Sequence, residues 1–375
     1  MNKTEIEQNW KRLVLKVGSA LISPERNGCS SQHLYSIANF IVQCRLAGIQ
    51  VVLVSSGSVA AGAHLFDEPD APSITVKKAM AAAGQSEMMA TWDRLFDFNT
   101  AQVLLTHADL RNRKRFVSVR ETLDALLAND LLPIVNENDA VTTDKLKVGD
   151  NDNLSAMVAT AANADCLIIC SDIDGFFDAN PQLDPAAKLI TDVNKIDATI
   201  YKMAGEATSS VGTGGMKTKI EAAEKAVSHG IDTYIVNGFK ESSFTALLRG
   251  ENPGTIFHPH KEPMHDQSHW MKHTTKVQGE LVVNDEFSIN EHLSTDLISP
   301  KDIVEVQGEF SAGEVVMLRK ENGEQIAKVK SNYGSCLLDF VANQDSDHIS
   351  EQLDKTDDPI VSKQFMALVS EKTDT

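Results

Sequence analysis

The chain has 375 residues, of which 42% are hydrophobic, and its formal net charge is −18. This length and hydrophobic content suit one large α/β domain and a smaller one, and they exclude an intrinsically disordered chain. No run approaches the roughly 18 apolar residues of a membrane span, and the polar start over residues 1–10 differs from a signal peptide, so we expect a cytoplasmic protein.

The first expected strand, over residues 13–17, is apolar except for Lys16 and ends at Gly18. At the end of a parallel strand, the ammonium of Lys16 would point toward the loops, where an anion such as phosphate could neutralise it. Gly18 would let a phosphate approach the backbone closely. The alternative is an edge strand whose lysine extends to water.

A second strand is expected over residues 51–54, after an amphipathic helix over residues 31–47. It leads into the turn Ser55-Ser-Gly-Ser58, whose hydroxyl and backbone N–H groups at a helix start favour an anion. The turn does not match G-x-G-x-x-G, and no G-x-x-x-x-G-K-[ST] occurs in the chain. Neither the dinucleotide fingerprint nor the Walker loop therefore applies.

Strands and helices continue to alternate through residue 170. Helices are expected over residues 86–98, 116–129 and 154–162, and strands over residues 102–106, 131–135 and 166–170. This alternation indicates a parallel sheet covered by helices on both faces. The fold class is therefore α/β, with an open and mainly parallel sheet sandwiched by helices.

The loop over residues 136–153 packs nine Asn, Asp and Glu side chains into eighteen residues, directly after an apolar strand. These groups would project from the carboxyl end of that strand, where open α/β sheets bind their ligands. Residues 149–153 predict a turn that caps the helix at 154–162. A single Asn or Asp would indicate only turn chemistry, but two clusters on one loop suit a small zwitterionic substrate and a charged co-substrate.

Two further loops carry polar groups. Residues 171–181 follow a buried strand, and Asp172 and Asp174 there could serve a metal, a nucleotide or only the turn, which is the default. Residues 209–219 hold three Gly, two Thr and two Lys before an amphipathic helix. Backbone N–H groups, hydroxyls and positive charge at a helix start are what a polyphosphate requires.

The five cysteines are scattered along the chain. Cys166 and Cys170 lie in one apolar run, and side chains four residues apart on a strand are too distant to form a disulfide. We interpret the cysteines as thiols of the core rather than as metal or redox groups.

Together, the segments Lys16-Val-Gly-Ser, Ser55-Ser-Gly-Ser, Asn136-Glu-Asn-Asp-Ala-Val, Val148-Gly-Asp-Asn-Asp-Asn and Gly212-Thr-Gly-Gly-Met-Lys-Thr-Lys resemble the amino acid kinase family. The pairing of the last two segments resembles its glutamate-phosphorylating branch. The resemblance covers nearly the whole chain in the same order. It implies an open parallel sheet, and transfer of the γ-phosphate of ATP to the side-chain carboxylate of L-glutamate, with Mg²⁺ on the nucleotide, as the first step of proline synthesis.

The resemblance also implies roles for individual residues. Lys16 and Lys219 would neutralise the phosphoryl group from opposite sides, and Asp152 would orient both lysines. The contacts to glutamate would come from Ser56, Gly57, Asp139 and Asn151.

The nucleotide site implied by the resemblance comprises Lys16, Ser171, Asp172, Thr213, Gly214, Gly215, Met216, Lys217, Thr218 and Lys219. Ser171 stands where the family pattern leads us to expect Thr, and its hydroxyl keeps the same role. Because a carboxylate nucleophile is already ionised at pH 7, no general base is assigned. No metal ion bound directly by the protein is expected.

After residue 254 the alternation of strands and helices gives way to a histidine-rich segment and short strand-like runs. Five histidines fall within residues 258–273, and strand-like runs follow at 279–283, 302–306, 314–318 and 326–329. We expect a kinase domain at 1–257, a linker at 258–276, a small β-rich domain at 277–355 and a tail at 356–375. The small domain resembles the PUA module. Histidines 265, 269 and 273 would align on a helix, but no carboxylate or thiol completes a zinc set.

The resemblance implies inhibition by proline and leads us to expect a homo-oligomer and a glutamyl phosphate reductase as partner. Two alternatives stay open: a sibling kinase with another acceptor, and a protein that binds RNA through the PUA-like domain. Residues 277–375 contain 8 Lys and Arg against 20 Asp and Glu, a net charge of −12, which argues against RNA. The one basic run, residues 111–115, favours an exposed helix start or a subunit contact.

Overall fold

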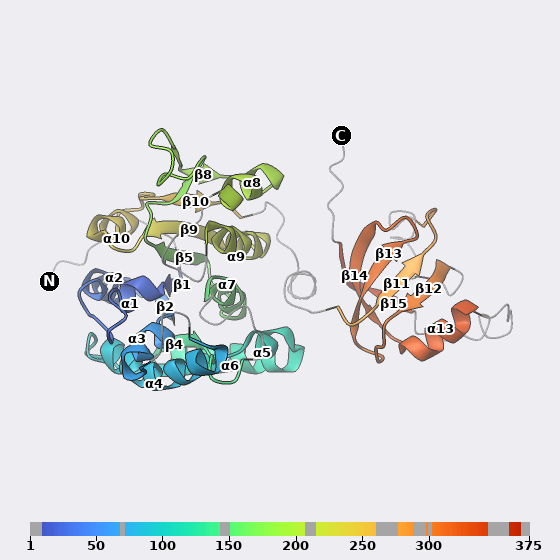
Figure 1. The fold of residues 1–375 in the computed structure, drawn as a ribbon, viewed down its shortest axis with the longest axis horizontal. Coiled ribbons are helices and arrows are strands. Elements are labelled where there is room, and N and C mark those ends of the chain that lie inside the picture. The colour runs from blue at the N-terminus through green and yellow to red at the C-terminus, as the bar shows by residue number, and fades with distance from the viewer. Residues whose placement is uncertain are drawn as a thin grey trace. The chain divides into compact units, whose positions relative to one another are not determined.

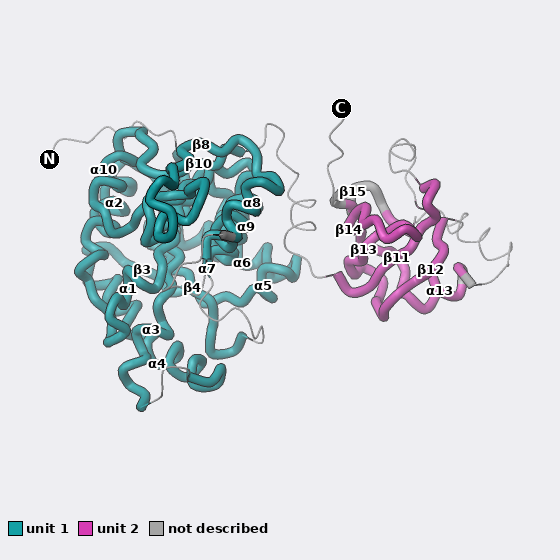
Figure 2. The backbone as a smooth tube through the Cα atoms, turned by 45° about the horizontal axis from the view of Figure 1, so that its top comes forward, with its two compact units in different colours: residues 1–263 teal, residues 264–375 magenta. Residues whose placement is uncertain are grey.

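The structure is a computed structural model that describes residues 10–67, 72–142, 151–206, 215–259, 277–287, 298, 302–343 and 360–368. The chain forms two compact units, residues 1–263 and 264–375 (Figure 2). The linker expected at 258–276 lies outside the described residues except for its first two, and the four-part division of the chain remains a proposal. In the described part of the chain, no helix is both long and apolar enough to cross a membrane.

Unit 1 is built on an eight-stranded sheet of order β3-β4-β2-β1-β5-β9-β10-β8. Its first six strands pair in parallel, whereas β10 runs antiparallel to β9. This arrangement confirms the open, mainly parallel sheet and brings the carboxyl ends of six strands to one edge. The strands are β1 Arg12–Val17, β2 Gln50–Ser55, β3 Thr100–Leu105, β4 Leu132–Glu137, β5 Cys166–Ser171, β8 Asp192–Val193, β9 Asp232–Asn237 and β10 Thr255–Phe257.

Helices cover both faces of this sheet, with α2 and α10 on one face and α7 and α9 on the other (Figure 1). Alternate residues of the central strands face the two helical layers, so β1, β2 and β5 are buried almost throughout. The helices are α1 Ser19–Ile22, α2 Leu34–Leu46, α3 Ser58–Gly62, α4 Ile74–Asp93, α5 His107–Arg111, α6 Arg113–Ala128, α7 Asn151–Ala161, α8 Ala198–Glu206, α9 Met216–Ser228 and α10 Glu241–Leu248.

Helix α4 begins at Ile74, well before the helix expected from residue 86. Ser73 caps it by accepting a hydrogen bond from the Val76 backbone N–H. Its first half is rich in alanine because it packs closely on α3. A Cβ on Gly62 would lie 2.0 Å from a backbone oxygen of α4, and one on Gly84 would lie 2.1 Å from the Ser58 carbonyl oxygen. Small residues therefore form the contact between the first half of α4 and α3.

Helix α7 also begins earlier than expected. Asn151, Asp152 and Asn153 form its first turn instead of a cap before it. All eleven residues of the helix are buried, and the carboxylate of Asp152 lies where the helix dipole favours a negative charge. Residues 143–150, including the predicted turn at Gly149, lie outside the described part.

The described residues of unit 2 contain a five-stranded sheet of order β12-β11-β13-β14-β15 and the helix α13 Ser335–Asn343. Its core combines apolar residues of the strands with Leu338 of α13 and with Phe287, Ile298, Phe310 and Ile360 from the connecting segments. Four strands lie where the sequence predicts them, which confirms a separate, strand-rich region. The fifth pairs with β14 from within the segment expected to be a tail, so the sheet extends past residue 355. The strands are β11 Glu280–Val283, β12 Ile303–Gln307, β13 Val315–Lys320, β14 Gln325–Ser331 and β15 Val361–Leu368.

The cysteines follow the expectation with one exception. Cys44, Cys166 and Cys170 are buried and Cys29 is half-buried, but Cys336 is exposed on α13. Burial raises the pKa of Cys44 to about 12, as expected for a thiol packed among apolar side chains. The expectation of core thiols is therefore wrong for Cys336, because α13 turns this residue away from the sheet.

Candidate active site

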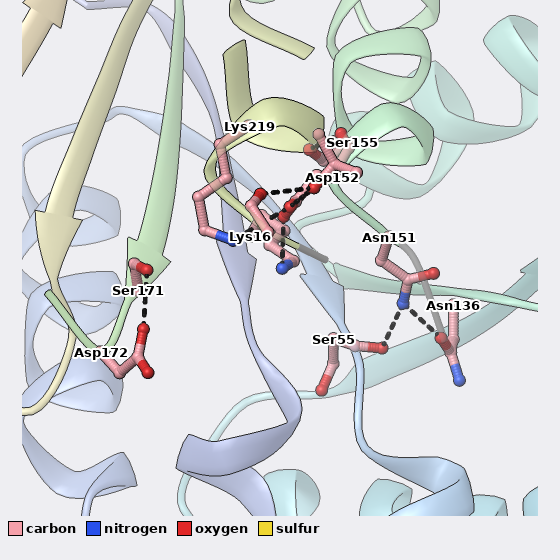
Figure 3. A network of polar contacts seen from close by, with 11 residues as sticks. Lys16, Ser55, Asn136, Asn151, Asp152, Ser155, Ser171, Asp172 and Lys219 are labelled. Carbon is pink, nitrogen blue, oxygen red and sulfur yellow. Dashed lines mark hydrogen bonds and ion pairs between the residues drawn. The ribbon is translucent and has the colours of Figure 1, made fainter. Parts of the chain in front are cut away.

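Three predicted catalytic side chains meet at the carboxyl edge of the sheet. Lys16 comes from the end of β1, Asp152 from the first turn of α7 and Lys219 from the first turn of α9. The ammonium Nζ of Lys16 lies 2.5 Å from Asp152 Oδ1, and that of Lys219 lies 3.1 Å from Oδ2 (Figure 3). One carboxylate thus holds both lysines, as the resemblance implies.

All three groups are withdrawn from solvent, with exposed fractions of 6% for Lys16, 1% for Asp152 and 8% for Lys219. Burial by itself raises the pKa of Asp152, but the charges of Lys16 and Lys219, with hydrogen bonds from Lys16 and Thr218, hold it well below its ordinary value. Asp152 is therefore ionised at neutral pH. The ammonium groups of Lys16 and Lys219 thus both pair with this one carboxylate.

The end of the glycine-rich segment adjoins this cluster. Gly215 precedes α9, and the Thr218 hydroxyl lies 2.8 Å from both Asp152 Oδ2 and the Gly215 carbonyl oxygen. Met216 is buried, whereas Lys217 is exposed. Thr213 and Gly214 lie outside the described residues. The helix start therefore brings Thr218 and Lys219 to Asp152, while Lys217 extends toward solvent.

The predicted glutamate contacts lie beside the lysine cluster, at the ends of β2 and β4. The Asn151 side-chain amide donates to the Ser55 carbonyl at 3.2 Å and to Asn136 Oδ1 at 2.6 Å (Figure 3). Ser56 Oγ and Asn151 Oδ1 are buried and have no hydrogen-bond partner among the described residues. Buried polar atoms are nearly always paired in folded proteins, so these two atoms are suited to a ligand.

Gly57 lies between these groups and α3. Its φ of 109° is in the left-handed region, and an added Cβ would lie 2.7 Å from the Ile22 side chain. Only glycine fits this turn without strain, and the turn places Ser56 and Ser58 on either side of it.

Asp139 borders a cavity of about 230 Å³ next to this turn. Its Oδ2 accepts a hydrogen bond of 3.1 Å from the Ser58 hydroxyl. The cavity joins the ends of β3 and β4 to α3 and α4, and it is lined by Ser58, Ala81, Ala82, Gln85, Leu104, Glu137, Asn138, Asp139 and Ala140. Its wall is mainly apolar but carries the polar residues Ser58, Gln85, Glu137, Asn138 and Asp139, and its volume suits a small amino acid.

Two residues that organise this region, Asn136 and Gln85, were given no role from the sequence. Asn136 donates to Gln85 Oε1 at 2.8 Å and to Ser58 Oγ at 3.3 Å, and it accepts from Asn151. The sequence could have indicated a role for Asn136, because Asn136 is the first polar residue after the apolar part of β4. No sequence pattern indicated a role for Gln85, since it lies within the alanine-rich helix α4. Only the packing of that helix places Gln85 beside Asn136.

The predicted nucleotide residues of β5 lie apart from the glutamate contacts, at the end of that strand (Figure 3). Ser171 Oγ donates to Asp172 Oδ1 at 3.2 Å. Asp174 accepts from Asn237 at 2.8 Å and pairs with Lys240 at 2.6 Å, and the Lys240 hydrogen bond lowers its pKa. Asp174 therefore serves the loop structure rather than a ligand.

No group of three or more His, Cys, Asp and Glu able to hold a metal ion occurs within the described residues. The histidines from 260 to 273 lie outside them. His258 is described, and it pairs with Asp192 at the surface.

Comparison with known proteins identifies several relatives. The sequence profile of the amino acid kinase family matches residues 11–237. The chain is 58% identical to glutamate 5-kinase 1 of Pseudoalteromonas translucida, over 96% of this chain and 98% of that protein. It is 52% identical to glutamate 5-kinase of Idiomarina loihiensis over 92% and 93%, and 46% identical to glutamate 5-kinase of Salinibacter ruber over 92% and 94%.

Proposed function

Because the chain belongs to the amino acid kinase family, we infer that it phosphorylates the side-chain carboxylate of L-glutamate with ATP. The product is L-glutamyl 5-phosphate, and the reaction is the first step of proline biosynthesis. The observation that carries this function is the pair of buried lysines held by one carboxylate at the edge of the sheet, beside a cavity that suits a small amino acid.

Phosphoryl transfer needs in-line positioning and positive charge around the phosphate oxygens, with little covalent help from the protein. In the proposed complex, Lys16 and Lys219 contact the transferred phosphoryl group, and Asp152 fixes the positions of both ammonium groups. The ionised glutamate carboxylate attacks the γ-phosphorus as the bond to the β–γ bridging oxygen breaks and ADP leaves, so the site needs no base.

Glutamate is proposed to lie between the Gly57 turn and Asp139. Ser56 Oγ and Asn151 Oδ1, which lack partners among the described residues, are available to its α-amino and carboxylate groups. The carboxylate of Asp139 attracts the α-ammonium group. A free α-amino group is therefore part of what this pocket recognises.

ATP is proposed to bind along the ends of β5 and α9, with its triphosphate against Gly215, Thr218 and Lys219 and its nucleoside toward Ser171 and Asp172. A helix start with hydroxyl and ammonium groups fits a triphosphate. Thr213, Gly214, Met216 and Lys217 complete the proposed nucleotide site. Mg²⁺ would be bound by the phosphate oxygens, where it neutralises charge on the nucleotide.

Further partners are proposals of the same kind. Proline carries the α-amino and α-carboxylate groups of glutamate without a side-chain nucleophile, so it is suited to occupy the pocket as an inhibitor. A homo-oligomer and delivery of the labile acyl phosphate to a glutamyl phosphate reductase are also proposed, as is a PUA-like character for unit 2.

The test is an acceptor panel. ADP release is measured with L-glutamate, L-aspartate, N-acetyl-L-glutamate, carbamate and UMP, and hydroxylamine traps any acyl phosphate as a hydroxamate. We expect hydroxamate with L-glutamate alone. Turnover with another acceptor in place of glutamate would assign the chain to a sibling kinase, and tight, salt-sensitive RNA binding by unit 2 would add a separate function.

A further inference from the structure

The turn at the end of β2 is held from below by a hydrogen bond in the core of unit 1. Trp92, near the end of α4, is fully buried, and its indole Nε1–H donates to the Ser55 hydroxyl at 2.9 Å. Ser55 is the last residue of β2 and is fully buried as well. A buried indole N–H requires an acceptor, and here the acceptor is a hydroxyl that can pass a hydrogen bond on.

The bond from Trp92 limits where the proton of the Ser55 hydroxyl can point. Two acceptors lie within reach, the Ser56 carbonyl oxygen at 3.1 Å and the Met88 sulfur at 3.3 Å. The proton cannot turn toward Trp92, because the indole N–H already lies against the oxygen. Since a thioether sulfur is a weak acceptor, the proton is directed to the Ser56 carbonyl.

A hydrogen bond to the Ser56 carbonyl fixes the peptide group that joins Ser56 to Gly57. This peptide is trans, and in a planar trans peptide the N–H points opposite to the C=O. The carbonyl faces the buried Ser55 hydroxyl, so the Gly57 N–H faces away from that contact. The Ser56 N–H donates to the Val17 carbonyl at 3.0 Å, which holds the same turn to the end of β1.

Ser55 also holds a second group of the proposed acceptor site. Its carbonyl accepts a hydrogen bond of 3.2 Å from the Asn151 side-chain amide (Figure 3). The amide oxygen Oδ1 of Asn151 and the hydroxyl oxygen of Ser56 have no hydrogen-bond partner among the described residues. Ser55 therefore connects the indole of Trp92 to the groups that are proposed to contact glutamate.

We propose that Trp92 and Ser55 are positioning residues for the acceptor: the indole N–H orients the Ser55 hydroxyl, the hydroxyl holds the Ser56 carbonyl, and the Gly57 N–H is thereby directed to a carboxylate of the acceptor. This inference rests on the proposed function and extends it to two residues of the core. Neither residue touches the reacting atoms, so their loss weakens glutamate binding and leaves the phosphoryl transfer step intact.

The test uses Trp92→Phe, Ser55→Ala and the double variant, each in the full chain. Loss of a well-placed hydrogen bond to a charged group weakens binding about tenfold or more. We expect each single variant to raise the KM for L-glutamate about tenfold, with kcat and the KM for ATP within about threefold. Because both residues act through one hydrogen bond, the double variant should also be raised about tenfold. Two independent effects would instead multiply to about a hundredfold.

Trp10→Phe is the matched control. Trp10 is a buried indole of the same apolar core, but it precedes β1 and so lies at the opposite end of the strands from the proposed site. Its replacement should lower the melting temperature and change neither KM. A merely structural role for Trp92 would give this same pattern, without the split between the KM for glutamate and kcat.

An unchanged KM for glutamate in folded Trp92→Phe, or a double variant raised about a hundredfold, would overturn the inference. If Trp92→Phe does not fold, benzothienylalanine at position 92 keeps the fused ring and removes only the N–H, and its KM for glutamate decides. Absence of hydroxamate with the wild type would instead contradict the proposed function, so the two failures are distinguishable.

Discussion

Replacement of Lys219 by methionine tests the proposed chemistry most directly, because it removes one charge and keeps most of the side-chain volume. The ammonium group lies 3.1 Å from Asp152 and is nearly inaccessible to solvent. A cation from the buffer therefore cannot take the place of the missing charge in the variant. Loss of one oriented transition-state contact costs about 10²–10³ in kcat. Since Lys16 stays 2.5 Å from the same carboxylate and is proposed to contact the phosphoryl group as well, we expect the lower end, a fall of about 10².

This fall corresponds to about 2.7 kcal/mol of transition-state stabilisation. The KM for glutamate should stay within about threefold, because Ser56, Asp139 and Asn151 are untouched. The assay is steady-state ADP release at saturating ATP, together with a thermal melt to show that the variant is folded. Lys202→Met, an exposed lysine on the neighbouring helix α8, is the control. A folded Lys219→Met enzyme with kcat within threefold of the wild type would refute the mechanism.

Three further results are expected. Asp152→Asn leaves two buried ammonium groups without their carboxylate and should lower the free energy of unfolding by about 3 kcal/mol or more. In the wild type the pKa of Asp152 is lowered in the folded state. The carboxylate therefore stabilises the fold fully above its unfolded pKa of about 3.9, and this stabilisation is lost as pH falls below that value. Urea unfolding from pH 7 to pH 3 should therefore show a shallower acid loss in the variant than in the wild type, and parallel curves would contradict the assignment. Proline should raise the apparent KM for glutamate without lowering kcat, and inhibition independent of glutamate concentration would exclude a shared pocket. A chain ending at Pro263, the end of unit 1, should still phosphorylate glutamate, and a truncate that melts cooperatively but releases no ADP would show that unit 2 contributes to the reaction.

Some of the site could be predicted because its residues carry local signals. Lys16 interrupts an apolar strand, and Lys219 follows a glycine-rich segment, so both stand out without any knowledge of the fold. Their convergence on Asp152 came from the family resemblance, since 67 positions separate Lys219 from that carboxylate. The structure brings all three together at the predicted edge of the sheet.

Other parts depend on contacts that leave no pattern in the sequence. In the sequence, His107 resembles an ordinary turn residue after a short strand. Only the pairing of β3 with β4 shows that its side chain contacts Glu137. The start of α4 was misplaced because alanine and glycine carry little periodicity. Asn151 was expected in a turn and lies in a helix, since the capping preferences of Asn and Asp are similar at the positions on either side of a helix start.

The contact between α3 and α4 has a consequence for the evolution of acceptor choice. Gly62 and Gly84 leave no room for a methyl group between the two helices, and Gln85, one residue further along α4, lines the cavity. Any larger residue at either glycine must increase the distance between α3 and α4, and this shift would also move Gln85. The spacing between the backbones of α3 and α4 thus sets the width of the pocket. One substitution at either glycine would change the length of acceptor that fits, although the substituted residue does not contact the acceptor.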